Sequence, residues 1–187
     1  FSAGEASSGE WGARTAGTHG NSLGVSMCTS PEAFEETLTA AGEVAGTPAV
    51  GATTVNVSAG GGSVGAGGAK YNVGDIVFFQ EADGQQYEVT AINNDALTIR
   101  QLDNPNGGGL KSALADGTDV RRRWAFYDLF DSAPGTSTYA TSKNVSDDEM
   151  HIVVYDKTGD ISGFRKDTAG ERTNAVLETY AFLSQHP

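Results

Sequence analysis

Two strand-like segments in the last third of the chain constrain its fold most strongly. Residues 150–155 form an apolar run that only His151 interrupts, and such a run is typical of a β-strand that is covered on both faces. Residues 174–184 form a second candidate strand after a polar connection that contains glycine. Residues 22–28 near the start are similarly apolar. We therefore predict that 22–28 and 150–155 lie in one sheet, although a long stretch of chain separates them.

The stretch between these segments has the pattern of a separate antiparallel β-domain. Its candidate strands are short, and Asp-Gly and Asn-Asn turns separate them, which is typical of hairpins. They cover residues 53–57, 73–79, 86–92 and 96–100. The Val-Gly-Asp-x-Val start at Val73, followed by Tyr-x-Val-x-x-Ile from Tyr87, resembles small SH3-like barrels. This resemblance implies a self-contained β-barrel.

These patterns predict an α+β, β-rich fold with a discontinuous platform and an insertion. We assign residues 1–45 and 122–187 to an α/β platform domain with a mixed sheet, and residues 46–121 to the inserted antiparallel β-barrel. A hydrophobic content of 38% with 25 glycines suits short strands and many turns. One helix is expected in the platform, because Ser30 is a good cap residue, Pro31 and Glu32 suit a first turn, and Gly42 can end it.

The composition argues against several classes of function. There are 24 acidic and 12 basic side chains, for a formal charge of −12, and such a surface repels phosphate backbones, so we predict no nucleic-acid partner. The single cysteine, Cys28, excludes an internal disulfide and a zinc site built from several thiolates. Its place in an apolar strand predicts a buried, unreactive thiol. No apolar run approaches the roughly 20 residues that a transmembrane helix needs.

The sequence predicts no catalytic residue, no cofactor and no metal site. Residues 156–159 (Asp-Lys-Thr-Gly) match the core of the P-type ATPase phosphorylation loop, but that family needs membrane helices and has Thr where this chain has Asp160. A hairpin turn is the favoured interpretation. Residues 60–70 lack the Gly-Lys-Ser/Thr ending of a phosphate-binding loop. The histidines show no His-x-x-x-His or Glu-paired metal-binding spacing, and no Gly-x-Ser-x-Gly elbow supports a Ser-His-Asp triad; they are His19, His151 and His186.

Two charged clusters are candidate subunit contacts. One is basic and precedes Trp124, and the other is acidic and precedes the 150–155 run. Their residues are Arg121, Arg122 and Arg123, and Asp147, Asp148 and Glu149. Such complementary patches could exchange partners between two packings of neighbouring subunits. Two alternatives stay open for the arginines, a solvated strand edge and stacking on a base; for the acids they are a solvated strand entry and a calcium site.

Two separated segments resemble the contractile tail sheath proteins of bacteriophages. Residues 9–12 (Gly-Glu-Trp-Gly) with residues 20–26 are similar to the family's Gly-x-Trp-Gly-Asn-x-Leu-x-Val strand, and residues 177–184 read Leu-Glu-Thr-Tyr-x-x-Leu-Ser. The resemblance covers roughly residues 10–29 and 150–184. It implies a non-enzymatic structural subunit whose copies stack into a helical tube around an inner tail tube. Contraction drives the inner tube through the host cell envelope.

The resemblance also implies partners and a location. In the full-length protein the partners would be other sheath subunits, the tail tube and the baseplate, with the host envelope contacted only indirectly. The location would be the virion tail sheath, assembled in the bacterial host cytoplasm; a related contractile injection machine is also compatible. The family's terminal arms and the aromatic-rich stretch that follows its Leu-Glu-Thr-Tyr segment are missing. We therefore expect an interior fragment of a longer protein that is monomeric by itself.

A host- or glycan-binding surface module is the competing hypothesis. It requires exposed aromatic side chains on the insertion, so Phe78, Phe79 and Tyr87 would have to face solvent. If they line the barrel interior instead, the sheath interpretation is favoured. A hydrolase or phosphotransferase would need a converging acid–base constellation, and these residues do not supply one.

Overall fold

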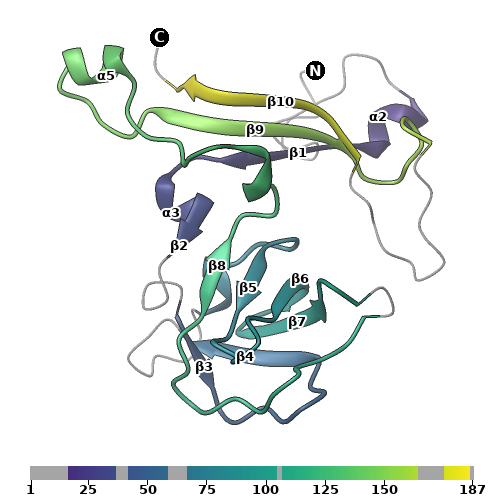
Figure 1. Cartoon of the computed structure of the whole chain (residues 1–187). Coiled ribbons are helices and arrows are strands. Elements are labelled where there is room, and N and C mark those ends of the chain that lie inside the picture. The colour runs from purple at the N-terminus through teal and green to yellow at the C-terminus, as the bar shows by residue number, and fades with distance from the viewer. Residues whose placement is uncertain (1–16, 37–41, 59–66, 105–106, 164–174, 186–187) are drawn as a thin grey trace. The chain divides into compact units, whose positions relative to one another are not determined.

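The chain folds into two compact units of α+β, strand-rich structure, with two antiparallel sheets and few helices (Figure 1). The computed structural model describes residues 17–36, 42–58, 67–104, 107–163 and 175–185. The first unit comprises Phe1–Thr29 and Pro134–Pro187, and the second comprises Ser30–Ala133. Residues 30–45 and 122–133, which the sequence analysis assigned to the platform, therefore belong to the second unit.

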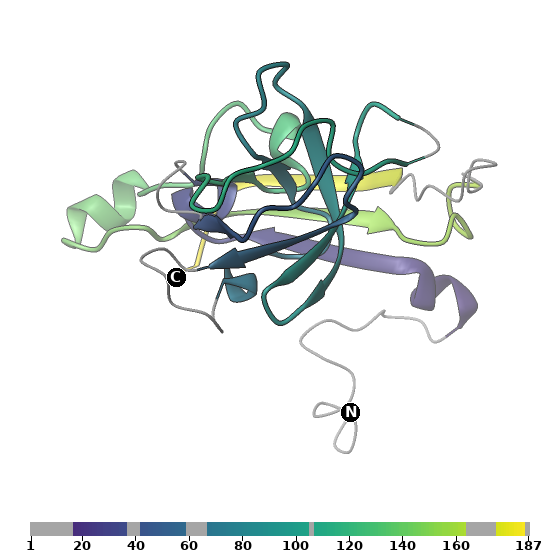
Figure 2. The same cartoon turned by 90° about the horizontal axis from the view of Figure 1, so that it is seen from below.

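Three antiparallel strands form the sheet of the first unit, in the order β1-β9-β10. They are β1 (Leu23–Cys28), β9 (Glu149–Asp156) and β10 (Ala175–Ser184). β1 pairs with β9 from Leu23↔Asp156 to Cys28↔His151, which confirms the predicted shared sheet. Both views show β9 (light green) between β1 (purple) and β10 (yellow) (Figure 1, Figure 2).

The expected mixed sheet is wrong, because every pair in this sheet is antiparallel. A parallel neighbour of β9 would need a long crossover connection. The chain instead enters a turn directly after Asp156. β10 pairs less regularly than β1, with bulges between Val176 and Glu178 and between Tyr180 and Leu183. Phe182, inside the second bulge, has a positive φ of 53°.

The helices of the first unit are short. α2 (Thr18–Ser22) leads directly into β1. α5 (Thr138–Ser142) starts at the N-cap Ser137, whose Oγ accepts a hydrogen bond from the Ala140 N–H at 3.0 Å. Such a cap satisfies one of the backbone donors that a helix start leaves without a partner.

The helix predicted between Ser30 and Gly42 is shorter than expected. α3 spans only Pro31–Phe34, and the Ser30 Oγ accepts a hydrogen bond from the Ala33 N–H at 3.1 Å, as a cap residue should. The chain then enters β2 (Glu35–Glu36), which pairs with β8. Cross-strand pairing with the arginines of β8 thus overrides the local helix signal. Residues 37–41 lie outside the described residues.

Seven antiparallel strands form the sheet of the second unit, in the order β2-β8-β5-β6-β7-β4-β3. Besides β2 they are β3 (Glu43–Ala45), β4 (Thr54–Ser58), β5 (Ile76–Phe78), β6 (Gln86–Asn93), β7 (Ala96–Gln101) and β8 (Arg121–Arg123). β5, β6 and β7 are consecutive neighbours, so the predicted meander is confirmed. Two 3₁₀ turns, η1 (Gly68–Lys70) and η2 (Tyr127–Leu129), lie in the connections.

The edge strand β3 is also tied to the segment that leads into β8. The Val44 N–H donates to the Thr118 carbonyl at 2.7 Å, and the Gly117 N–H donates to the Val44 carbonyl at 2.9 Å. Glu43 and Asp119 form an isolated antiparallel bridge. The sheet therefore curls until its β3 edge meets the chain just before β8.

A hydrophobic cluster forms the core around which the strands β3 to β7 of the second unit pack. Its strand residues alternate with exposed or half-buried ones, as in β4, β6 and β7, because successive side chains on a strand point to opposite faces. The cluster contains Val44, Val55, Val57, Tyr71, Val77, Phe79, Tyr87, Val89, Leu97, Ile99, Leu110, Leu114 and Val120. Full burial of each large apolar side chain contributes about 1.5–3 kcal/mol.

Gly109 lies where the loop before β8 packs tightly against the backbone of residues 51–52. A Cβ at this position would collide with the carbonyl oxygens of Gly51 and Ala52. The neighbouring Leu110 holds this backbone in place, because its N–H donates to the Ala52 carbonyl at 2.9 Å and its carbonyl accepts from the Gly51 N–H at 2.7 Å. We expect Gly109→Ala to lower the free energy of unfolding by about 1–3 kcal/mol, because backbone cannot yield as a flexible side chain does. Urea denaturation measures this change. Gly135→Ala is the control, since its Cβ would meet only Glu149 Oε2 at 3.8 Å; an equal loss in both variants would contradict the prediction.

Candidate interaction surfaces

Arg122, one of the predicted contact residues, is an internal anchor of the second unit. Its side chain lies on β8 and the residue is only 5% exposed. The guanidinium forms ion pairs with Glu36 (Nε–Oε2 3.3 Å) and Asp75 (Nη1–Oδ2 3.4 Å). It also donates to the carbonyls of Glu32 at 2.6 Å and Ala33 at 3.2 Å. Arg122 therefore joins α3, β2 and the turn before β5.

Asp75 experiences two opposing effects at this anchor. It is 1% exposed, and burial raises the pKa of its carboxyl to about 6 although the Arg122 guanidinium opposes the shift. A raised folded-state pKa means that the associated stabilisation is complete below the ordinary pKa of 3.8 and is lost as the pH rises through about 6. At neutral pH, the ion pair with Arg122 offsets part of the free energy needed to keep the buried Asp75 carboxyl charged.

Arg121 and Arg123 flank Arg122 on the strand and remain partly exposed. Both form ion pairs with Glu35, at 2.9 Å between Arg123 Nε and Glu35 Oε1. Both guanidiniums also lie over the Phe78 ring, with CZ-to-centroid distances of 5.7 and 5.0 Å, and that of Arg123 lies 4.6 Å from the Tyr127 centroid. Ion pairing and cation–π contacts within the unit therefore hold these side chains in place.

The acidic cluster belongs to the first unit, whereas the arginines belong to the second. Asp148 is 1% exposed and fastens the start of α5 to the end of β10. Its carboxylate accepts hydrogen bonds from Ser184 Oγ at 2.6 Å, Ser137 Oγ at 2.8 Å and the Ser137 N–H at 2.8 Å. These bonds, led by that from Ser184, lower the pKa of Asp148 to about 2.

The other two acids keep more solvent contact. Asp147 is exposed and has a positive φ of 56°. Glu149 is half-buried, and its Oε2 accepts a hydrogen bond from the Gly135 N–H at 3.0 Å. The sequence alone does not distinguish these roles, because neighbouring carboxylates look alike until their hydrogen-bond donors are known.

The segment that matches the ATPase loop forms a turn built around Asp156. This residue is fully buried, and its carboxylate accepts hydrogen bonds from Ser22 Oγ and from the N–H groups of Gly159, Ile161 and Ser162 at 2.8–3.0 Å. Burial alone would raise the pKa of Asp156, but hydrogen bonds from Ser162, Ser22 and Ile161 outweigh burial and hold it below its ordinary range. A turn follows Asp156 as predicted, but the tight hairpin to Ile161 is wrong, because Ile161 lies in the turn itself and the strand that pairs with β9, β10, begins only at Ala175.

His151 has a structural contact in the same sheet. It is fully buried, its Nδ1 accepts a hydrogen bond from the Phe182 N–H at 3.1 Å, and the two rings meet edge to face at 4.7 Å. This bond pins the second bulge of β10. His19 is exposed, and His186 lies outside the described residues. Within the described part of the chain, no three His, Cys, Asp or Glu side chains are grouped as a metal site would require.

The aromatic residues that the glycan-binding hypothesis requires are mostly internal. Phe79 and Tyr87 are 1% and 0% exposed in the core, and Phe78 is half-buried beneath the two arginines. These three rings therefore form no open aromatic platform. Cys28 is fully buried, as predicted.

The exposed apolar side chains of β10 were missed from the sequence. They are Val176, Leu177, Tyr180, Phe182 and Leu183, each between 36% and 44% exposed, and we call them the β10 surface. Tyr180 lies opposite Ile152, which also lies opposite Met27 of β1; Met27 is 38% exposed. The signal was present in residues 175–183, where apolar side chains occupy both alternating sets and only Glu178 is charged.

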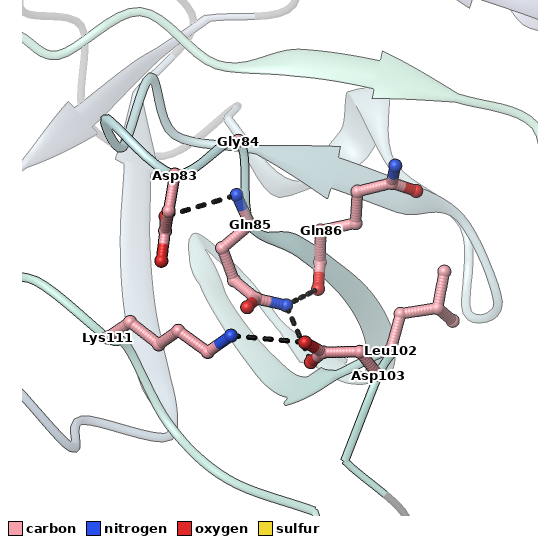
Figure 3. Close-up of a pocket in the computed structure, with 7 residues that line it drawn as sticks. All are labelled: Asp83, Gly84, Gln85, Gln86, Leu102, Asp103 and Lys111. Atoms are coloured by element: carbon pink, nitrogen blue, oxygen red, sulfur yellow. Dashed lines mark hydrogen bonds and ion pairs between the residues drawn. The ribbon is translucent and has the colours of Figure 1, made fainter.

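A polar groove of about 390 Å³ was also missed, and it lies on the second unit (Figure 3). One side is the turn around Gly84, and the other is the segment that follows β7. The lining side chains are Asp83, Gln85, Gln86, Leu102, Asp103 and Lys111. No sequence motif marks them, because they come from segments about 20 residues apart that the fold brings together.

Comparison with protein-family models, with curated proteins and with solved structures finds no match to this chain. Among the described residues, no helix has the length and apolar character needed to cross a membrane.

The role of Arg122 can be tested by removing its charge. We expect Arg122→Met to lower the free energy of unfolding by about 3–5 kcal/mol, because it leaves the buried Asp75 without its cation. Chemical denaturation measures the loss. Arg121→Met is the matched control on the same strand, expected to change stability by about 1 kcal/mol or less because that pair is partly exposed. Similar losses in the two variants would show that Arg122 is not the anchor.

The fastening role of Asp148 predicts a specific pH dependence. Because its folded-state pKa is lowered to about 2, the stabilisation is present above the ordinary pKa of 3.8 and is lost as the pH falls towards 2. We expect Asp148→Asn to lower stability at neutral pH and to flatten the stability curve between these two pH values. Unfolding curves collected across this range measure both effects. Asp131→Asn, at an exposed position, should leave the curve as in the unmodified chain.

Proposed function

We propose that this chain is part of a structural subunit of a contractile tail sheath. The subunit stacks with its copies into a helical tube around the tail tube and contracts to drive that tube through the host cell envelope. Its partners in the full-length protein are other sheath subunits, the tail tube and the baseplate, and nucleic acid is not among them. It belongs to the virion tail and assembles in the bacterial host cytoplasm.

The observation that carries this proposal is the position of the segments that resemble the family. Residues 20–26 run from α2 into β1, residues 150–156 form most of β9, and residues 177–184 lie in β10. These segments are distant in sequence but are hydrogen-bonded neighbours in one sheet. Unrelated local coincidences would have no reason to share a sheet. Residues 9–12, which also contribute to the resemblance, lie outside the described residues.

The β10 surface supports an assembly role. Residues 177–184 are all exposed, including the apolar side chains of Leu177, Phe182 and Leu183. Clusters of exposed apolar side chains mark sites that contact another protein, a membrane or a ligand, and the proposal takes the contacting partner to be another protein. A subunit that packs among its copies can cover these apolar side chains, whereas a module that stays dispersed in solvent leaves them exposed.

In this proposal the second unit is an SH3-like barrel that decorates the subunit. The consecutive strands β5, β6 and β7, the apolar interior, and the bonds between β3 and the segment before β8 support this assignment. The glycan-binding alternative loses the aromatic platform that it required, because Phe79 and Tyr87 belong to the interior.

Only four of the six charged residues remain candidate subunit contacts in this proposal. Arg121, Arg123, Asp147 and Glu149 keep solvent contact, and in the proposal they can exchange ion pairs with neighbouring subunits. Arg122 and Asp148 serve mainly to hold their own units together, because their polar atoms are engaged within those units. A charge reversal that probes assembly therefore belongs at Arg121.

Electron microscopy of the parent particle tests the function directly, since a striated contractile tube labelled by an antibody to this chain is expected. We further expect Tyr180→Lys and Leu183→Lys to fold but to enter the tube at least about tenfold less efficiently, because a lysine would have to be buried on assembly. Val50→Lys is the control, at an apolar residue of the second unit that is 65% exposed. A particle without such a tube, or normal incorporation of the β10 variants, would contradict the proposal.

A further inference from the structure

We propose that the polar groove of the second unit binds one neutral hexopyranose unit of a polysaccharide. This site is separate from the β10 surface, and it does not use the aromatic side chains considered above.

Buried hydrogen bonds fix the position of the groove. The hydroxyl of Tyr87, which is fully buried, donates to Glu81 Oε2 at 2.5 Å and accepts from the Lys111 N–H at 2.9 Å. Glu81 Oε1 accepts from the Ser112 N–H at 2.6 Å. These hydrogen bonds therefore link the turn that contains Glu81 to the segment that contains Lys111, beneath the surface of the groove. Such support gives the two walls a defined separation before any ligand arrives, which is how pre-organised sites limit the entropy cost of binding.

A second connection crosses the groove itself. Gln85 is only 6% exposed, and its Nε2 donates to Asp103 Oδ1 at 3.0 Å and to the Gln86 carbonyl at 2.8 Å. Lys111 Nζ reaches the other carboxylate oxygen of Asp103 at 3.1 Å. Figure 3 shows Lys111 and Gln85 converging on Asp103, with Asp83 near the opposite wall. The carboxylate of Asp103 is thus held between an amide and an ammonium group.

The groups left for a ligand suit a polyol. The Lys111 ammonium has three donors and uses one on Asp103, and the exposed Asp83 accepts only a 3.3 Å bond from the Gln85 N–H. Leu102, 48% exposed, provides an apolar surface on the same wall as Asp103. Hydroxyl groups can both donate to Asp83 and accept from Lys111, while the C–H face of a pyranose ring can cover Leu102. A volume of about 390 Å³ accommodates one such ring.

The net charge of the groove favours an uncharged ligand. Two carboxylates and one ammonium group leave the groove with a net charge of about −1, on a chain whose formal charge is −12. Sugars that carry carboxylate, sulfate or phosphate groups are therefore disfavoured, and a neutral hexose unit fits best. A single small site of this kind predicts a dissociation constant on the order of 1–10 mM.

Amide chemical-shift titration of the full chain tests the proposal, with the methyl glycosides of glucose, galactose and mannose as probes and methyl glucuronide as the acidic comparison. We expect at least one neutral glycoside to give saturable shifts at residues 83–86, 102–103 and 111, and the glucuronide to bind at least roughly threefold more weakly. No saturable shift with any neutral glycoside at about 100 mM, saturable shifts confined to other residues, or preference for the glucuronide would overturn it.

A pair of charge-matched variants completes the test. Asp83→Asn keeps a side-chain oxygen for the Gln85 N–H, so the turn is preserved, but the carboxylate that would bind hydroxyls is lost. We expect it to weaken glycoside binding about threefold to tenfold. Asp131→Asn changes the net charge equally at an exposed position outside the groove and should bind as the unmodified chain does. Equal effects of the two variants, in spectra that show both to be folded, would refute the assignment.

Discussion

The first unit depends on the pairing of β9 along both of its edges. β1 comes from the start of the chain and β10 from its end, and neither pairs with the other. Every inter-strand backbone hydrogen bond of this sheet therefore involves β9. The fully buried His151 and Val153 lie near the middle of this strand. This is why an apolar run of a few residues constrains so much of the fold: without it, the two remaining strands have no common partner.

The longer strands, the pairing of β1 with β9 and the β5-β6-β7 meander could be predicted because their signals are local or periodic, whereas the short strands β2, β3 and β8 and the full strand order could not. Alternation in β4, β6 and β7, and the continuous apolar run in β9, appear in the residues themselves. The helix after Ser30 was overpredicted because its end is set by β8, which lies more than 80 residues further along and pairs with Glu35 and Glu36. The exposure of β10 could not be predicted, because apolar composition alone does not say whether a strand is covered.

The candidate sites were harder to predict because charged residues were judged by composition. In an acidic chain, the triplet from Arg121 to Arg123 reads as one surface patch. The structure separates it into a buried anchor at Arg122 and two residues stacked on Phe78. The same holds for the acids, since Asp148 and Asp156 bind backbone and hydroxyl donors of their own unit. Burial and hydrogen-bond partners, which depend on the whole fold, decide these roles.

The two bulges of β10 have a consequence for how copies of this protein can associate. A straight strand at the border of a sheet offers an evenly spaced row of amide and carbonyl groups, and identical molecules can add to it without limit. In β10 that spacing is interrupted on either side of residues 178–180, so only a very short regular stretch remains. Indefinite growth into amyloid-like fibres is thereby discouraged. In the proposed sheath subunit, ordered polymerisation would instead rely on matching side-chain surfaces, which can be released and re-formed in a second geometry.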